Sequence, residues 1–283
     1  MDDCAKACFH ASLYALVIAS VAVSGFMDSV TTEDGLEHYA EKPWTFLHSH
    51  VPMLEHVPMP LNTIVNVIYI VLGVYWIKKW MKTAKDNPGM FKEGDLYMQY
   101  VFQWMSILYG FVQLLRILTQ NHRAAILDQW YTLPIFAWAA CMSNHVENGW
   151  DLRYNLRLIR ISTMSYGAAL VHPLGFDVVL VLHIFWALYK VLSLVYSMQH
   201  HSWGVKLSFW KTFLALSGFV FLKLLDHYLP SFHEFFSYVT GHFLSKICDG
   251  LQFCFGAEFM YHVYRQRFQH SKDNLTKNHK YIR

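Results

Sequence analysis

Charged and histidine side chains interrupt several long apolar segments of this chain. They are Arg116, Asp128, Lys223, Asp226, His227, His242, Lys246 and Asp249. An ionisable group inside a membrane is costly and usually faces the interior of a helix bundle. The last three residues are spaced i, i+4 and i+7, which places them on one face of a helix. Side chains of these types could bind a metal, a substrate or one another.

The charges of this group balance, because it contains three lysine or arginine and three aspartate side chains. A balanced set can pair internally and so avoid the penalty of a lone buried charge. This balance favours a network of salt bridges and hydrogen bonds that fixes helix packing. A zinc site would instead show a surplus of histidine and carboxylate ligands. A metal or substrate site is therefore the alternative interpretation.

Other histidines are weaker candidates for a site. The segment 28–57 contains His38, His48, His50 and His56. The HSH sequence within it suggests the spacing of metal ligands, but an acidic, exposed loop with histidines is more often merely polar. His183 and His262 are isolated on apolar helices, where we expect them to make packing hydrogen bonds.

No motif of a known reaction is present. The sequence lacks GxSxG, HExxH, Walker and GxGxxG motifs, so we predict no catalytic residue and no cofactor. The formal net charge of +3 is too small to indicate a nucleic-acid partner. The five cysteines follow neither a disulfide framework nor the paired spacing of a zinc ribbon.

About eight segments are apolar and long enough to cross a membrane as helices, which takes roughly 20 residues each. They cover 9–27, 58–80, 97–119, 125–145, 155–171, 174–197, 207–227 and 239–264. Pro173 and Gly175 separate the fifth segment from the sixth. Only 15% of the residues are charged and 54% are hydrophobic, whereas about a quarter of a soluble domain is charged. We therefore predict an all-α integral membrane protein with about eight transmembrane helices.

Lysine and arginine are concentrated in alternate loops and in both tails, whereas the opposite side holds only Lys42 and Arg123. The positive-inside rule then places both termini in the cytosol and the loop 28–57 in the lumen or outside the cell. The predicted domains are a cytosolic tail 1–8, a transmembrane domain 9–264 and a basic cytosolic tail 265–283. The first segment could also be a cleaved signal peptide, but its start is not distinctly positive and its apolar run is long. We favour a retained helix.

Several stretches carry a resemblance that covers most of the chain in order and spacing. They include DSVTTEDGLEHYAEKP (28–43), YGFVQLLRILTQNHRAAILDQWYTLPIFAW (109–138) and TGHFLSKICDGLQF (240–253). On these stretches the chain resembles the vertebrate transmembrane protein 187 family. That family is multi-pass and has no established biochemical activity, so the resemblance implies a membrane fold and not a reaction.

Helices two to eight are also similar, more distantly, to the seven-helix superfamily of alkaline ceramidases and progestin and adipoQ receptors. This resemblance implies a seven-helix core plus one added N-terminal helix. Members of the superfamily bind zinc through a Ser-x-x-x-His helix, an Asp that opens the next helix, and a final His-x-x-x-His helix. FVQLLR (111–116) gives Gln113 and Arg116 where the Ser and first His would lie. ILDQW (126–130) keeps Asp128, and GHFLSK (241–246) keeps His242 but has Lys246 in place of the second His.

The resemblance thus implies a degraded metal site in which Asp128 and His242 are the remaining possible ligands, which are too few for zinc. We expect Arg116 and Lys246 to replace the charge of the metal and to hold Asp128. The expected polar network comprises Gln113, Arg116, Asp128, Lys223, Asp226, His242, Lys246 and Asp249.

The expected function is that of a non-catalytic membrane protein that contacts membrane lipids and an unidentified protein partner or lipid ligand. An intramembrane hydrolase of lipid amides or esters and a small-molecule transporter are the alternatives. We expect residence in the Golgi or another endomembrane rather than in the plasma membrane.

Overall fold

The computed structural model describes residues 2–32, 41–42, 57, 59–198 and 202–280, and the side chains of these as far as 273. The described residues form helices and turns without any strand. The helices are α1 (Asp3–Val23), α4 (Pro60–Val65), α5 (Val67–Asp86), α6 (Asp95–Thr119), α7 (His122–Asn148), α8 (Leu152–Ser165), α9 (Ala168–Val171), α10 (Gly175–Ser197), α11 (Trp203–Leu225), α12 (Leu229–Phe232), the 3-10 helix η2 (Glu234–Ser237) and α13 (Gly241–Lys280).

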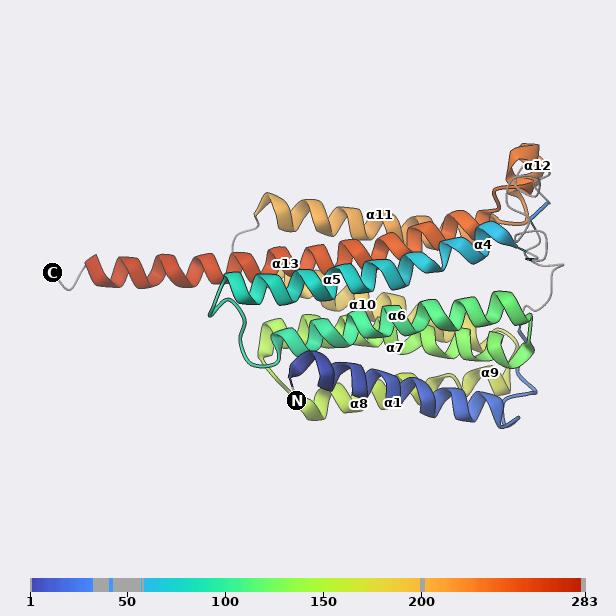
Figure 1. Cartoon of the computed structure of the whole chain (residues 1–283), viewed down its shortest axis with the longest axis horizontal. Coiled ribbons are helices and arrows are strands. Elements are labelled where there is room, and N and C mark those ends of the chain that lie inside the picture. The colour runs from blue at the N-terminus through green and yellow to red at the C-terminus, as the bar shows by residue number, and fades with distance from the viewer. Residues whose placement is uncertain (1, 33–40, 43–56, 58, 199–201, 281–283) are drawn as a thin grey trace.

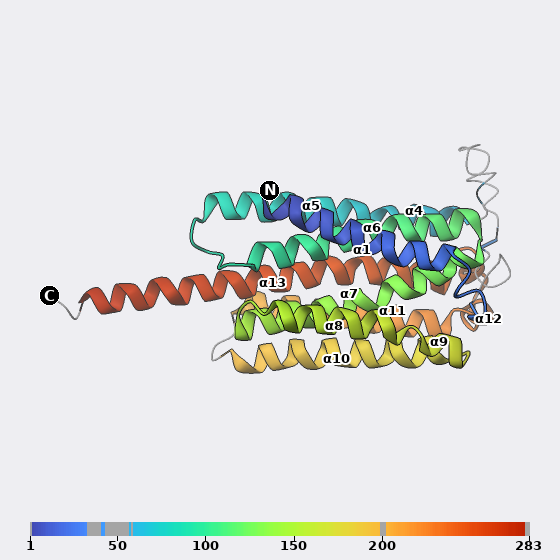
Figure 2. The same ribbon diagram turned by 90° about the horizontal axis from the view of Figure 1, so that it is seen from below.

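The long helices run along one common direction (Figure 1). α1 begins and α13 ends at the same end of the bundle, which we call the terminal end. The opposite, distal end holds the ends of α6 and α11 and the starts of α7 and α13 (Figure 1). α5 and α10 lie on opposite sides of α13 when the bundle is turned (Figure 2). α11 packs along α13, α10 along α7, and α5 and α1 along α6.

Five helical segments within the described residues are long and apolar enough to cross a membrane. They are α1, the combined segment Pro60–Asp86 of α4 and α5, α6, α10 and α11. α7 and α13 have 27 and 40 residues, but they are too polar to meet the same criterion. α7 can be polar because it is buried along almost its whole length among other helices, where Asp128 pairs with Arg116 and His145 with Asp95.

Several helix boundaries differ from the predicted ones. The segment predicted as one helix over 155–171 is two helices, α8 and α9, with a turn at Tyr166 and Gly167. The predicted break before Gly175 is confirmed. A Cβ at Gly175 would lie 2.0 Å from the carbonyl oxygen of Ala168, so only glycine permits this turn. The segments predicted as tails are largely helical, since α1 begins at Asp3 and α13 continues to Lys280.

Side-chain caps explain where several helices begin. Asp2, Asn121, Asp151 and Ser202 each accept a hydrogen bond from a backbone N–H in the first turn of the helix that follows. Such caps satisfy amide groups that have no partner inside the helix. Within the bundle, a Cβ at Gly73 would lie 2.5 Å from the side chain of Ile107, so this glycine lets α5 approach α6 closely.

Candidate functional site

Asp128 is the centre of a buried group of polar side chains at the distal end. It lies in the second turn of α7 and is 4% exposed. Its two carboxylate oxygens accept hydrogen bonds from the Gln113 amide and the Arg116 guanidinium, both on α6. Thr132, one turn further along α7, donates to the Asp128 carbonyl over 2.9 Å. The aspartate is thus held by one cation and one neutral donor.

The other two aspartates of the expected network have different partners. Asp226 ends α11, and its Oδ1 accepts a hydrogen bond from the His242 backbone N–H over 2.9 Å. It therefore satisfies an amide in the first turn of α13 and ties α13 to α11. Asp249, two turns deeper in α13, accepts a hydrogen bond from the Tyr69 hydroxyl of α5 over 2.6 Å.

The two lysines of the network lie beside a small polar cavity. Lys246 is 5% exposed, and its ammonium lies 5.5 Å from the centre of the Tyr109 ring. The cavity has a volume of about 30 Å³ and is lined by residues that include Arg116, Asp128, Lys223, His242 and Lys246. A water molecule needs roughly 10–15 Å³, so the cavity has room for about two waters.

The eight residues of the expected network, Gln113, Arg116, Asp128, Lys223, Asp226, His242, Lys246 and Asp249, are called the ionic cluster below. Five of them line the cavity. Gln113 does not line it but donates a hydrogen bond to Asp128, which does. Asp226 and Asp249 do not line it. His227 is exposed and lies outside this cavity as well.

The donor set of the ionic cluster does not fit zinc. Zinc requires three or four ligands, each a neutral imidazole, a thiolate or a carboxylate. No group of three histidine, cysteine or acidic side chains that could hold a metal occurs in the part of the chain that the structure describes. Arg116 already bonds Asp128, the carboxylate that the distant resemblance places on the metal. The histidines of the loop, His38, His48, His50 and His56, lie outside the described residues.

A second buried group of charges lies at the terminal end and was not predicted. Asp95, the first residue of α6, is fully buried. It lies 2.9 Å from the His145 ring of α7, and it accepts hydrogen bonds from the Lys92 backbone N–H and from Arg267 of α13. In the sequence, Arg267 is one of several cations of the predicted basic tail. Its partners are far away in the chain, so charge patterning could not identify them.

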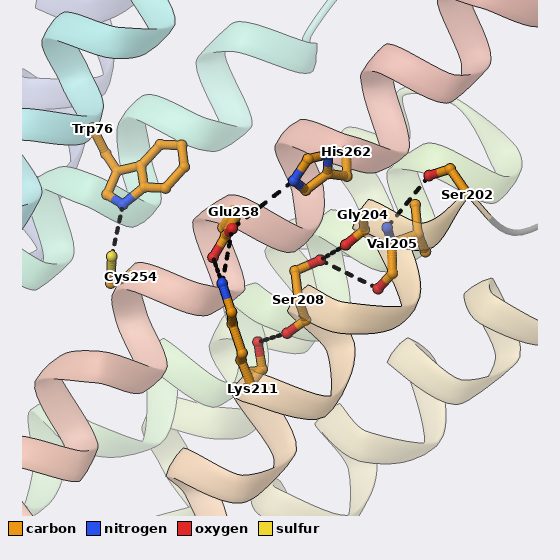
Figure 3. Close-up of polar contacts among 10 residues, drawn as sticks. Trp76, Ser202, Gly204, Val205, Ser208, Lys211, Cys254, Glu258 and His262 are labelled. Atoms are coloured by element: carbon orange, nitrogen blue, oxygen red, sulfur yellow. Dashed lines mark hydrogen bonds and ion pairs between the residues drawn. The ribbon is translucent and has the colours of Figure 1, made fainter.

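A third group links α11 and α13 within their apolar lengths (Figure 3). The Lys211 ammonium lies 3.2 Å from each carboxylate oxygen of Glu258, and His262 lies 3.9 Å from the same carboxylate. His262 is therefore the neighbour of an ion pair rather than an isolated packing residue. His183 does make the expected packing hydrogen bonds, to the Ser162 hydroxyl and the Val179 carbonyl.

These three polar groups lie at different levels of the bundle rather than in one layer. The ionic cluster joins α6, α7, α11 and α13 at the distal end, and Asp95 joins α6, α7 and α13 at the terminal end. All three groups include α13. In each group at least one acidic side chain pairs with a cation on another helix.

Comparisons with known proteins agree with the helical membrane fold. The model of the TMEM187 protein family matches residues 7–261. The chain is 39% identical over 262 residues to human (Homo sapiens) transmembrane protein 187, which covers 91% of this chain and 92% of the relative. It is 38% identical over 255 residues to the bovine (Bos taurus) transmembrane protein 187, covering 90% and 95%. No solved structure matches. The chain therefore belongs to the transmembrane protein 187 family.

Proposed function

We propose that this protein is a non-catalytic integral membrane protein in which the ionic cluster takes the structural place of a metal centre. The observation that carries the proposal is the pairing of Asp128. Its two carboxylate oxygens accept hydrogen bonds from Arg116 and Gln113, and the fixed positive charge of Arg116 beside the carboxylate opposes a metal ion at this position. The protein then acts through what its helices bind rather than through a reaction at this site.

Two cations supply the charge that a divalent metal would bring. Arg116 keeps its proton under all ordinary conditions, and Lys246 lies beside the same cavity. Three carboxylates and three cations balance the ionic cluster, so it needs no further ion. In this arrangement the salt bridge fixes α6 against α7, and the Asp226 contact fixes α13 against α11.

The topology belongs to the same proposal. Eight spans, with both termini in the cytosol, put the ionic cluster near the lumenal face and the Asp95 group near the cytosolic face. The proposal also places the protein in the Golgi or another endomembrane rather than in the plasma membrane. Glycosylation tags inserted after Lys42 and after Lys280, with imaging of the tagged chain, test the topology and the location.

The two alternative functions have less support. A lipid hydrolase needs an activated water or nucleophile, and Asp128 is already paired. A transporter needs a polar path from one face to the other. The cavity of about 90 Å³ in the middle of the bundle is lined mainly by phenylalanine, leucine, alanine and similar side chains, which oppose the passage of an ion or a polar solute.

Zinc content and a charge exchange test the proposal. Purified protein should contain no stoichiometric zinc by mass spectrometry of the metal. Single reversals, Arg116→Asp or Asp128→Arg, should reduce the amount of folded protein, and the double reversal should restore it in part. One zinc per chain that is lost on changing His242 and Asp128 would overturn the proposal, as would a double reversal no better than either single one.

A further inference from the structure

Three cavities follow one seam through the bundle, from the distal end to the terminal end. The first is the ionic-cluster cavity of about 30 Å³, the second the middle cavity of about 90 Å³, and the third a terminal cavity of about 670 Å³. On α10 they are lined in turn by Leu180, Ala187 and Leu194. Residues seven apart lie on nearly the same helical face, so one face of α10 borders the whole seam.

The same heptad spacing recurs on the two helices that face α10. The lining residues are Thr132, Ala139 and Val146 on α7, and Ser245, Gln252, Phe259 and Gln266 on α13. α10 packs along α7 and α11 along α13, whereas α10 and α11 do not pack extensively over their described lengths. The seam is thus the space between two helix pairs.

The middle cavity is a mainly apolar slot. Its polar lining residues are Ser143, Thr212 and Gln252. The two hydroxyls donate to carbonyls of their own helices, whereas the side-chain oxygen of Gln252 has no hydrogen-bond partner among the described residues. Gly256 on α13 also lines it, and a Cβ added there would meet no atom within 4 Å. The slot therefore has room beside α13 that the protein itself does not fill.

The terminal cavity offers one positive and one negative side chain. The Arg267 guanidinium bonds Asp95, and it makes no other hydrogen bond to a residue that the structure describes. Arginine has five N–H donors, so several remain. Glu147 accepts one hydrogen bond, from Ser193 over 3.0 Å, and its second oxygen has no donor among the described residues.

The geometry points to a phospholipid with a phosphate and a primary ammonium in its headgroup, bound in this seam. We propose that the phosphate accepts hydrogen bonds from Arg267, that the ammonium donates to Glu147, and that one acyl chain enters the middle cavity. A choline headgroup has no N–H to donate, and a purely anionic headgroup would meet the Glu147 carboxylate.

The depth of the seam agrees with this occupant. Arg267 and Gly256 are 11 residues apart on one helix, or about 16 Å by the helical rise. One leaflet contributes about 15 Å of hydrocarbon. A lipid of the leaflet at the terminal end thus reaches the middle cavity with its headgroup still at its ordinary level. The site is separate from the ionic cluster, and the zinc content of that cluster does not bear on it.

Photolabelling tests the site in the full-length protein. The protein is reconstituted in phosphatidylcholine vesicles that contain a phosphatidylethanolamine with a diazirine on one acyl chain, irradiated, and mapped by mass spectrometry. Label is expected on the peptides of α7, α10 and α13 around Ala187 and Gly256. Unlabelled phosphatidylethanolamine should compete, and phosphatidylglycerol should compete much less.

Two variants test the binding of the headgroup and of the acyl chain separately. Gly256→Leu fills the slot and should abolish the interior label, whereas Gly256→Ala is the matched control and should keep it. Glu147→Gln should reduce the preference for phosphatidylethanolamine over phosphatidylglycerol by about tenfold, since one charge-assisted hydrogen bond is lost. Leucine favours a helix more than glycine does, so Gly256→Leu should fold.

Three results would overturn the proposal. They are label confined to the lipid-facing outer surface, interior label that survives Gly256→Leu, and equal competition by phosphatidylglycerol in the wild-type protein. If Gly256→Leu fails to fold, as judged by gel filtration, the competition experiment with Glu147→Gln decides the question alone.

Discussion

Replacing Asp128 by asparagine tests whether the ionic cluster stabilises the bundle. The change keeps the size of the side chain and removes its charge, so Arg116 loses its buried counter-ion. The side chains of Asp128 and Arg116 are only 5% and 12% exposed. Breaking a buried pair by removing one partner costs about 3–5 kcal/mol.

That free energy converts into a readily measured shift. One kcal/mol lowers the melting temperature of a chain of this size by roughly 2–4 °C. Asp128→Asn should therefore lower the apparent melting temperature in detergent by roughly 6–20 °C. Intrinsic fluorescence can follow the unfolding, because the chain has 10 tryptophans. Adding Arg116→Met to the same chain should restore part of the loss, since the uncompensated cation is removed.

A matched pair elsewhere supplies the control. Asp28 and Arg123 also form a carboxylate–guanidinium pair, with side chains 45% and 42% exposed. Exposed pairs contribute little to stability, so Asp28→Asn should leave the melting temperature nearly unchanged. The reasoning is refuted if Asp128→Asn is no more harmful than Asp28→Asn, or if the added Arg116→Met makes the protein still less stable.

Three further predictions concern other parts of the chain. Burial raises the pKa of Glu41 to about 7, although its carboxylate accepts hydrogen bonds from the Leu61 N–H and from Asn62. The contact of the Glu41 side chain with Leu61 and Asn62 should therefore be most stable below pH 4.5. It should lose stability as the pH rises to about 7, because the buried carboxyl group then ionises. Hydrogen exchange at Leu61, corrected for its intrinsic pH dependence, should show this loss in the wild type and not in Glu41→Gln. Lys211→Met should destabilise the protein more than the double variant Lys211→Met with Glu258→Leu, and a double-mutant cycle of thermal unfolding measures the coupling. Additive losses would argue against that ion pair. Gly175→Ala should lower the melting temperature because its methyl group would clash with a carbonyl, whereas Gly256→Ala should raise it slightly. Equal effects of the two glycine changes would contradict the close approach seen at Gly175.

The sequence was most informative where chemistry and periodicity coincide. The i, i+4, i+7 spacing of His242, Lys246 and Asp249 placed them on one face, and all three are buried in α13. The approximate helix positions followed from long apolar runs. Hydropathy alone does not settle the number of spans, because α7 and α13 carry polar side chains that only buried partners make tolerable.

Contacts between residues far apart in the chain could not be predicted from the sequence. Asp95 lies 172 positions from Arg267 and Lys211 lies 47 from Glu258. Taken alone, Asp95 resembles a charged loop residue and Arg267 a charged tail residue. Lys211 and Glu258 resemble interruptions of an apolar segment. Pairing depends on how the helices are ordered in the bundle, and no local pattern encodes that order. The partner of Asp249 was missed for the same reason, because Tyr69 looks like an ordinary apolar-helix tyrosine.

α13 has a mechanical consequence for the whole molecule. Its 40 residues form one uninterrupted helix, about 60 Å long by the helical rise, and its C-terminal part projects beyond the other helices (Figure 1). The helix carries Arg267, Glu258 and Lys246, which belong to the three polar groups. If it moves as one rigid unit, a partner that turned the projecting end would turn all three residues together.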